Sequence, residues 1–158
     1  MKTTSVLSAI LLGAGVMAFT ACGPSAPSAA DTPTPGDAEA GQRVYLRVCF
    51  VCHQPTGLGV PGSFPPLAGN PVVAGSPDRL IRIVLHGLQG PVEVGGKPFN
   101  GVMPAQGAAL KDFEIANVLT YVRSAWGNNA PPVSIEAVTQ VRAGLRRDKP
   151  WTWAELNP

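Results

Sequence analysis

The sequence predicts one mainly α-helical domain, because three segments repeat apolar residues at helical spacing. The first runs from about Ala38 to Cys49 behind Asp37, whose carboxylate can accept hydrogen bonds from the free amides of a first helical turn. The second begins at Ser76-Pro77-Asp78, with serine as the cap, and carries the apolar stripe Leu80, Ile81, Val84, Leu85 and Leu88. The third begins near Asp112, can stop at Gly127, and carries Ile115, Val118, Leu119, Val122 and Trp126.

The N-terminus has the composition of an export signal. Met1 and Lys2 precede an apolar run from Val6 to Phe19, which is too short to favour a membrane-spanning helix. Phe19-Thr20-Ala21-Cys22-Gly23 then resembles the lipobox of bacterial lipoproteins, with Phe19 in place of the usual leucine. We therefore expect a signal peptide at residues 1–21, a lipid on Cys22, and a protein held on the periplasmic side of a membrane. Two alternatives are cleavage after residues 28–30, which gives a soluble periplasmic protein, and an uncleaved apolar anchor.

Residues 22–36 are rich in Pro, Ser, Ala and Thr and show no apolar periodicity. Such a segment cannot bury enough apolar surface to offset the entropy of ordering it. We expect a flexible, lipid-anchored linker, followed by a folded domain at 37–127 and a C-terminal extension at 128–158. Without the leader and linker about 120 residues remain, enough for a single core.

The chain contains one Cys-x-x-Cys-His motif, at Cys49, Cys52 and His53. Two thiols at this spacing can form thioether bonds with the two vinyl groups of one haem, and the adjacent imidazole then faces the iron. The chain has three cysteines and two histidines, too few and too far apart for a zinc site. A thioredoxin-like pair would need a strand before it. The motif therefore predicts one covalent haem c, with His53 as a ligand of the iron.

Glycine and proline dominate the segment after His53, which indicates loops that wrap an apolar group. Further on, Val92-Glu93-Val94 and Lys97-Pro98-Phe99 flank Gly95-Gly96, the composition of a tight hairpin turn. Pro98 should keep this hairpin short or at a sheet edge. We expect a small β-hairpin inserted in the helical domain, followed by a loop over residues 100–104.

Several motifs around the haem segment resemble those of class I cytochromes c. Gly41-x-x-x-Tyr45 is similar to the family's Gly-x-x-x-aromatic, and Pro65-Pro66-Leu67-Ala68-Gly69 to its Pro-x-Leu-x-Gly. The resemblance implies that Gly41 permits a close crossing of the first and last helices, where Tyr121 packs. It also implies that the Pro65 carbonyl accepts a hydrogen bond from His53 and that Leu67 packs on the haem. From the residues alone, a stiff turn at Pro65-Pro66 stays an alternative. The implied fold is that of class I cytochrome c, decorated by the hairpin and the extension.

Met103 is the candidate for the sixth iron ligand, because it is the one methionine left after removal of the leader. Its place before Pro104 resembles that of the family's distal ligand. Two alternatives stay open: His86 as the ligand, and an open iron site.

Trp151 and Trp153 lie near the end of the extension, and two indoles are costly to leave in water. We expect the extension to pack back on the domain, while Arg142, Arg146 and Arg147 stay solvated or meet the haem propionates. The alternative is a flexible tail that docks a partner.

A net charge of +2 without a basic patch argues against nucleic-acid binding. With both axial positions filled, the chain is expected to carry single electrons in a bacterial respiratory chain and not to be an enzyme. Its partners would be redox proteins, such as a respiratory complex, a dehydrogenase, or a terminal oxidase or reductase, and the membrane through the lipid. The alternatives are a cytochrome subunit of a dehydrogenase or reductase complex, and a haem enzyme or sensor with an open iron site.

Overall fold

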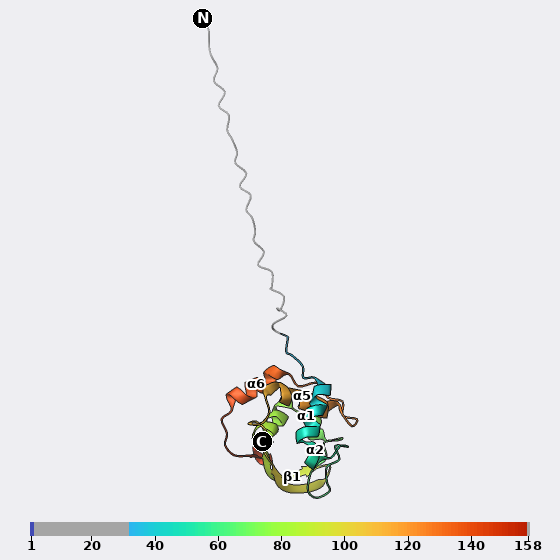
Figure 1. Ribbon diagram of the computed structural model, residues 1–158. Helices are drawn as coiled ribbons and strands as arrows, with labels where there is room; N and C mark the ends of the chain where they lie inside the picture. Colours follow the sequence, from blue (N-terminus) through green and yellow to red (C-terminus); the bar gives the residue numbers. More distant parts are fainter. Residues whose placement is uncertain (2–31, 158) are drawn as a thin grey trace.

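The computed structural model describes Met1 and residues 32–157 of the 158-residue chain (Figure 1). The predicted signal peptide at 1–21, the lipid on Cys22 and most of the predicted linker at 22–36 lie outside the described residues and stay predictions. Within the described part, no helix is both long and apolar enough to cross a membrane.

The first predicted helix is confirmed as α1 (Ala38–Val48). Asp37 caps it as expected, accepting hydrogen bonds from the amides of Glu39 at 2.8 Å and Ala40 at 3.2 Å. A single further turn, α2 (Phe50–His53), follows directly and contains most of the Cys-x-x-Cys-His motif. The cap thus sets the start of the helix that leads into the haem segment.

The second predicted helix is α4 (Pro77–His86), preceded by a short unpredicted helix, α3 (Pro71–Ala74). Ser76 occupies the N-cap position as predicted, although its side chain makes no capping hydrogen bond with any described residue. Pro77, whose ring fixes a helical φ, starts the helix without it. Gly87, with φ 81°, ends the helix, and Leu88 therefore belongs to the following strand instead of the helical stripe.

The predicted hairpin is confirmed and is longer than expected. Strands β1 (Leu88–Val94) and β2 (Lys97–Met103) each have seven residues and pair antiparallel around Gly95 and Gly96, both with positive φ. The loop predicted over residues 100–104 is wrong for residues 100–103, which form the end of β2. Pro98 is tolerated because β2 is an edge strand, paired on one side only in the sheet order β2-β1-β3.

The third predicted helix is α5 (Asp112–Ser124), which packs across α1. A Cβ at Gly41 would collide with the Asn117 carbonyl and lie 2.9 Å from the Tyr121 Cβ, so the glycine permits this crossing as expected. Trp126 was wrongly placed in the helix. It lies beyond the helix end with φ 54°, and its ring packs against those of Tyr45 and Tyr121.

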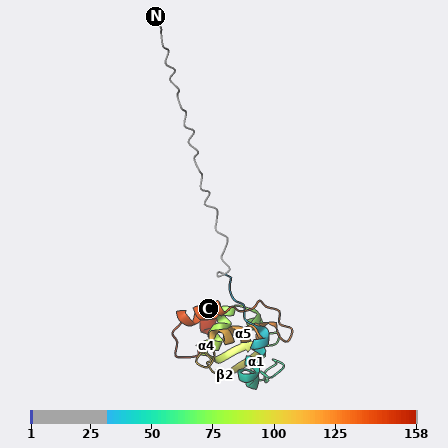
Figure 2. The ribbon, with the colours of Figure 1, turned by 45° about the horizontal axis from the view of Figure 1, so that its top comes forward.

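The C-terminal extension packs back on the domain, as predicted. It contains α6 (Ile135–Gly144), β3 (Trp151–Thr152) and α7 (Trp153–Leu156). Figures 1 and 2 show it in orange to red beside α4, with which α6 is in contact. Ser134 caps α6 by accepting from the Ala137 amide at 3.1 Å.

Two of the three arginines of the extension form ion pairs that were not predicted. Arg142 pairs with Asp112 at 2.6 Å and donates to two backbone carbonyls, and Arg147 pairs with Glu155 at 2.8 Å. Neither side chain is simply solvated, because protein acceptors hold both, and contact of these arginines with the haem propionates stays a prediction. Arg146 is exposed.

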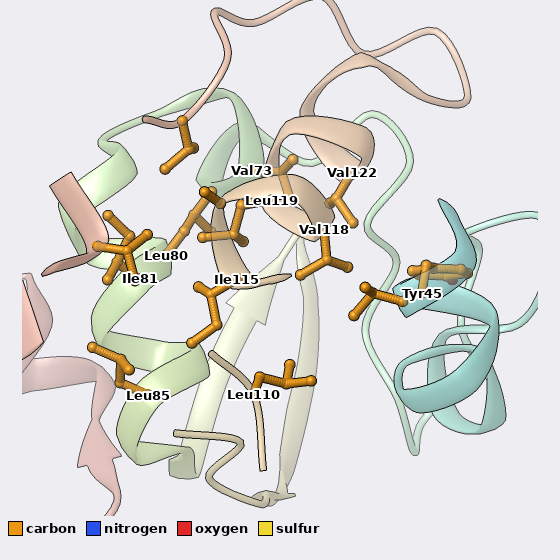
Figure 3. Packing of buried hydrophobic residues seen from close by; sticks show 14 residues of the cluster. Tyr45, Val73, Leu80, Ile81, Leu85, Leu110, Ile115, Val118, Leu119 and Val122 are labelled. Carbon is orange, nitrogen blue, oxygen red and sulfur yellow. The ribbon is translucent and has the colours of Figure 1, made fainter. Parts of the chain in front are cut away.

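The hydrophobic core lies between α1, α4 and α5. Figure 3 shows side chains of α4 and α5 pointing toward one another, with Tyr45 of α1 at one end. The buried members of this main cluster are Val44, Tyr45, Val73, Leu80, Ile81, Leu85, Leu110, Ile115, Ala116, Val118, Leu119, Val122, Val133 and Val138. The three helices thus enclose the main core, and the hairpin and the haem segment lie beside it.

Candidate haem site

Two thiols and an imidazole lie close together along one short helical turn. Cys49 stands between α1 and α2, and Cys52 and His53 lie within α2. All three side chains are half-buried. Helical geometry brings residues three apart to the same face, so the two thiols can reach one partner.

Burial, and after it the neighbouring Cys52, raises the pKa of the Cys49 thiol to about 11. Reactive thiols of dithiol oxidoreductases have a lowered pKa instead. The pair also follows a helix and not a strand. Both observations disfavour a thioredoxin-like function for Cys49 and Cys52.

His53 is oriented by a backbone oxygen. Its Nδ1 lies 3.1 Å from the Pro65 carbonyl, as the sequence predicted. Because a carbonyl can only accept, Nδ1 carries the proton and Nε2 is left for a metal. Burial lowers the pKa of His53, although the hydrogen bond to Pro65 opposes this shift. The imidazole is therefore kept in the neutral form that binds metals.

The loop that presents Pro65 and Leu67 is fixed from both sides. The Gly57 carbonyl accepts from the amides of Leu67 at 2.7 Å and Ala68 at 3.0 Å. Asn128 donates to the Leu67 carbonyl at 3.0 Å and accepts from the Gly69 amide at 2.9 Å. Sequence reasoning missed Asn128, because an asparagine just after a helix has no local pattern that indicates a distant loop as its partner.

An apolar cavity of about 890 Å³, partly open to solvent, lies beside this loop. Cys49, His53, Leu67 and Met103 all line it. A smaller cavity of about 610 Å³ shares His53, Pro65 and Met103 with the first and is also lined by Cys52. The structure thus brings together every residue predicted to bind the haem, although metal ligation by His53 and Met103 stays a prediction.

His86, the rival ligand, is placed elsewhere. Its Nδ1 lies 3.2 Å from the Arg147 carbonyl, and its ring meets Trp151 edge-on with the ring centroids 6.5 Å apart. Both contacts are with the C-terminal extension. The position of His86 therefore favours a packing role.

The lining of the larger cavity fits a haem. Apart from the thiol and the imidazole, it is almost entirely apolar, as a macrocycle needs. Its apolar walls are contributed by the loop after His53, by α4, by β1 and by α5. Sequence reasoning missed Val92, Val94, Trp153 and Gln106 among the lining residues. The alternation in Val92-Glu93-Val94 was a signal for the first two, since it indicates one buried strand face.

Comparison with known proteins agrees with this geometry. The Cytochrome c family model matches residues 38–126. This chain belongs to the cytochrome c family. The cytochrome is 44% identical over 112 residues to "Cytochrome c-552" of Thermus thermophilus, an alignment that covers 65% of this chain and 84% of that protein.

Other relatives are longer proteins, of which the alignment covers only a part. The cytochrome is 41% identical over 109 residues to the cytochrome c subunit of alcohol dehydrogenase (quinone) of Gluconobacter oxydans, covering 68% of this chain and 23% of that subunit. It is 36% identical over 115 residues to the gluconate 2-dehydrogenase cytochrome c subunit of Pantoea cypripedii, covering 72% of this chain and 25% of that subunit.

Family membership confirms the predicted class I fold with a β insertion and one covalent haem c, for which Cys49-x-x-Cys52-His53 is the attachment motif. The cytochrome therefore transfers electrons.

Proposed function

We propose that this cytochrome is a single-electron carrier in which His53 and Met103 would both hold the haem iron, and that it is not itself an enzyme. The observation that carries the proposal is that both side chains line the same two cavities. Haem, when bound, supplies one-electron chemistry between ferric and ferrous iron.

The residues of the chain would tune that chemistry. The Pro65 carbonyl holds His53 in one tautomer and makes the imidazole more basic. A thioether from Met103 raises the reduction potential relative to stronger donors, and the apolar walls act in the same direction by excluding water. With both ligands in place, substrates cannot reach the iron.

Carbon monoxide binding to the reduced protein tests the closed site. The wild-type protein should not bind carbon monoxide at neutral pH, and its oxidised form should show the weak red-edge charge-transfer band of iron–thioether ligation. Met103→Ala should abolish the band and permit binding, because it removes the thioether. Ile115→Ala is the matched control and should retain the band, since Ile115 is buried in the main core and lines neither cavity. If Met103→Ala leaves the band and the carbon monoxide response unchanged, the ligand assignment is wrong.

The partners we propose are redox proteins, such as a respiratory complex, a dehydrogenase, or a terminal oxidase or reductase. The names of the two dehydrogenase subunits support a second candidate, in which this cytochrome is itself a subunit of a dehydrogenase or reductase complex. The two candidates differ in stoichiometry. After mild detergent extraction, a carrier should migrate alone, whereas a subunit should co-migrate with a catalytic protein through size exclusion at a fixed ratio.

We also propose that the cytochrome is tethered to the periplasmic face of a membrane through a lipid on Cys22. The support is the short apolar run followed by small residues before the cysteine. Cys22→Ser should release the protein or block its maturation, and intact mass of the wild-type protein should show the acyl groups. An unacylated N-terminus near residue 31 would instead show a soluble periplasmic protein.

A further inference from the structure

Met103 and the C-terminal extension belong to the same sheet. Met103 is the last residue of β2, and β3 forms the opposite edge in the order β2-β1-β3. Leu88 of β1 pairs with Met103 on one side and with Trp151 on the other. Met103, Leu88 and Trp151 therefore form one row across the sheet, from the proposed ligand to the extension.

Side chains reinforce this row. Ile83, Trp151 and Leu156 form a second hydrophobic cluster, separate from the main core, and Leu88, Met103 and Leu145 pack against it. Trp151 is only 9% exposed. Met103 therefore packs against a cluster that contains two buried residues of the extension.

The backbone at the end of α4 connects the same parts. The Trp151 amide donates to the Gly87 carbonyl at 3.0 Å. A Cβ at Gly87 would lie 2.5 Å from the Met103 carbonyl oxygen, so these two backbone segments are in close contact. Trp151 is thus joined to the backbone that abuts Met103 as well as to the strand beside it.

Residues 147–156, which we call the strap, are held in a defined conformation. The Arg147 guanidinium lies 4.0 Å from the centroid of the Trp151 indole and pairs with Glu155 at 2.8 Å. The Glu155 carboxylate also accepts from the Thr152 amide at 2.8 Å and closes the first turn of α7. Trp153 of α7 lines the larger cavity together with Met103. Such a segment can act as a fixed support.

We infer that the strap is a positioning element for Met103, which holds the end of β2 in place and so keeps the thioether at the iron. This inference rests on the proposed function, in which Met103 is the sixth ligand. A two-stranded hairpin alone is only marginally stable in water, and a third strand together with a packed helix stabilises it. The strap supplies a third strand, β3, and a packed helix, α7, beside the row of residues that contains Met103.

Exogenous imidazole provides the test, because it binds ferric iron only when the thioether leaves. In the complete haem-loaded protein, Trp151→Ala should lower the dissociation constant for imidazole at least tenfold and weaken the red-edge band below the melting temperature. Ile115→Ala is the matched control. Ile115 is fully buried in the main core and belongs to neither the second cluster nor the lining of the two cavities. It should lower the melting temperature without changing the imidazole affinity.

If both variants lower the imidazole dissociation constant equally, or neither does, the strap has no specific effect on Met103 and the inference is overturned. Arg147→Ala is the second variant, for use if Trp151→Ala does not fold. It removes the cation stacked on Trp151 and the ion pair with Glu155, and it should also lower the dissociation constant for imidazole. Met103→Ala distinguishes a failure of the ligand assignment from a failure of the positioning role of the strap. If it binds imidazole no better than the wild type, the ligand assignment itself is wrong. If it binds much better while Trp151→Ala and Arg147→Ala do not, only the positioning role of the strap fails.

Discussion

The crossing of α1 and α5 at Gly41 leaves no room for one added carbon atom. In Gly41→Ala, the new methyl group would collide with the Asn117 carbonyl and lie 2.9 Å from the Tyr121 Cβ. The carbonyl belongs to the backbone of a helix and cannot turn away. The two helices must therefore separate, and the buried contacts between Tyr45 and Tyr121 must loosen.

The expected cost follows from two opposing effects. Overpacking a close contact typically costs 1–3 kcal/mol, and a rigid backbone obstacle places this case at about 3 kcal/mol. Replacing glycine by alanine in a helix returns about 1 kcal/mol through lower entropy of the unfolded chain. The free energy of unfolding should thus fall by about 2 kcal/mol, which for a domain of this size lowers the melting temperature by roughly 8 °C.

Thermal unfolding of the haem-loaded protein, followed by far-ultraviolet circular dichroism, measures this change. Gly144→Ala is the control, because Gly144 lies in α6 and a Cβ there would meet no described atom within 4 Å. It should leave the melting temperature unchanged or raise it slightly. Equal melting temperatures for Gly41→Ala and the wild type would refute the argument that the crossing requires a glycine.

Three further changes test other contacts. Asp37→Ala should lower the free energy of unfolding in urea by about 1 kcal/mol through loss of the α1 cap, and an unchanged urea midpoint would contradict this. Arg142→Gln, which loses the partly exposed pair with Asp112, should cost about 1–2 kcal/mol, whereas Arg146→Gln at an exposed position should cost little. Hydrogen bonds from Thr152, and then from Arg147, lower the pKa of Glu155 to about 2. Because the folded pKa is the lower one, Glu155 stabilises the strap above its ordinary pKa of 4.5, and this contribution is lost as the pH falls toward about 2. Tryptophan fluorescence of the wild type should change over this range, and Glu155→Gln should remove that part of the change.

The features that sequence predicts well in this protein are local. The carboxylate of Asp37 reaches amides within three residues, so the start of this helix can be read from neighbouring positions. The same holds for the Gly95-Gly96 turn, where positive φ values require the residue type. The haem segment is also local, since its two thiols and imidazole lie within five consecutive residues.

The features that sequence did not predict depend on partners far along the chain. Trp126 continues the helical spacing of α5, yet its indole donates to the Pro55 carbonyl at 3.0 Å and its backbone leaves the helix. The extent of β2 depends on pairing with Leu88 and on the position of Pro98 at an open edge. Arg142 pairs with Asp112, which lies thirty residues before it in the chain. No periodicity within the chain encodes such partners.

The hairpin and the C-terminal extension look like independent additions in the sequence, with Met103 and Trp151 lying 48 residues apart, but they form one structural unit. The pairing of Leu88 with both Met103 and Trp151 makes the hairpin the centre and one edge of a sheet whose other edge is the extension. A hairpin of this kind is marginal without a third strand or a helix against it. A relative that has the hairpin should therefore also have a C-terminal segment, or another apolar cover, at the position of Trp151. A relative that lacks both should hold its distal methionine on a loop supported by the helices alone.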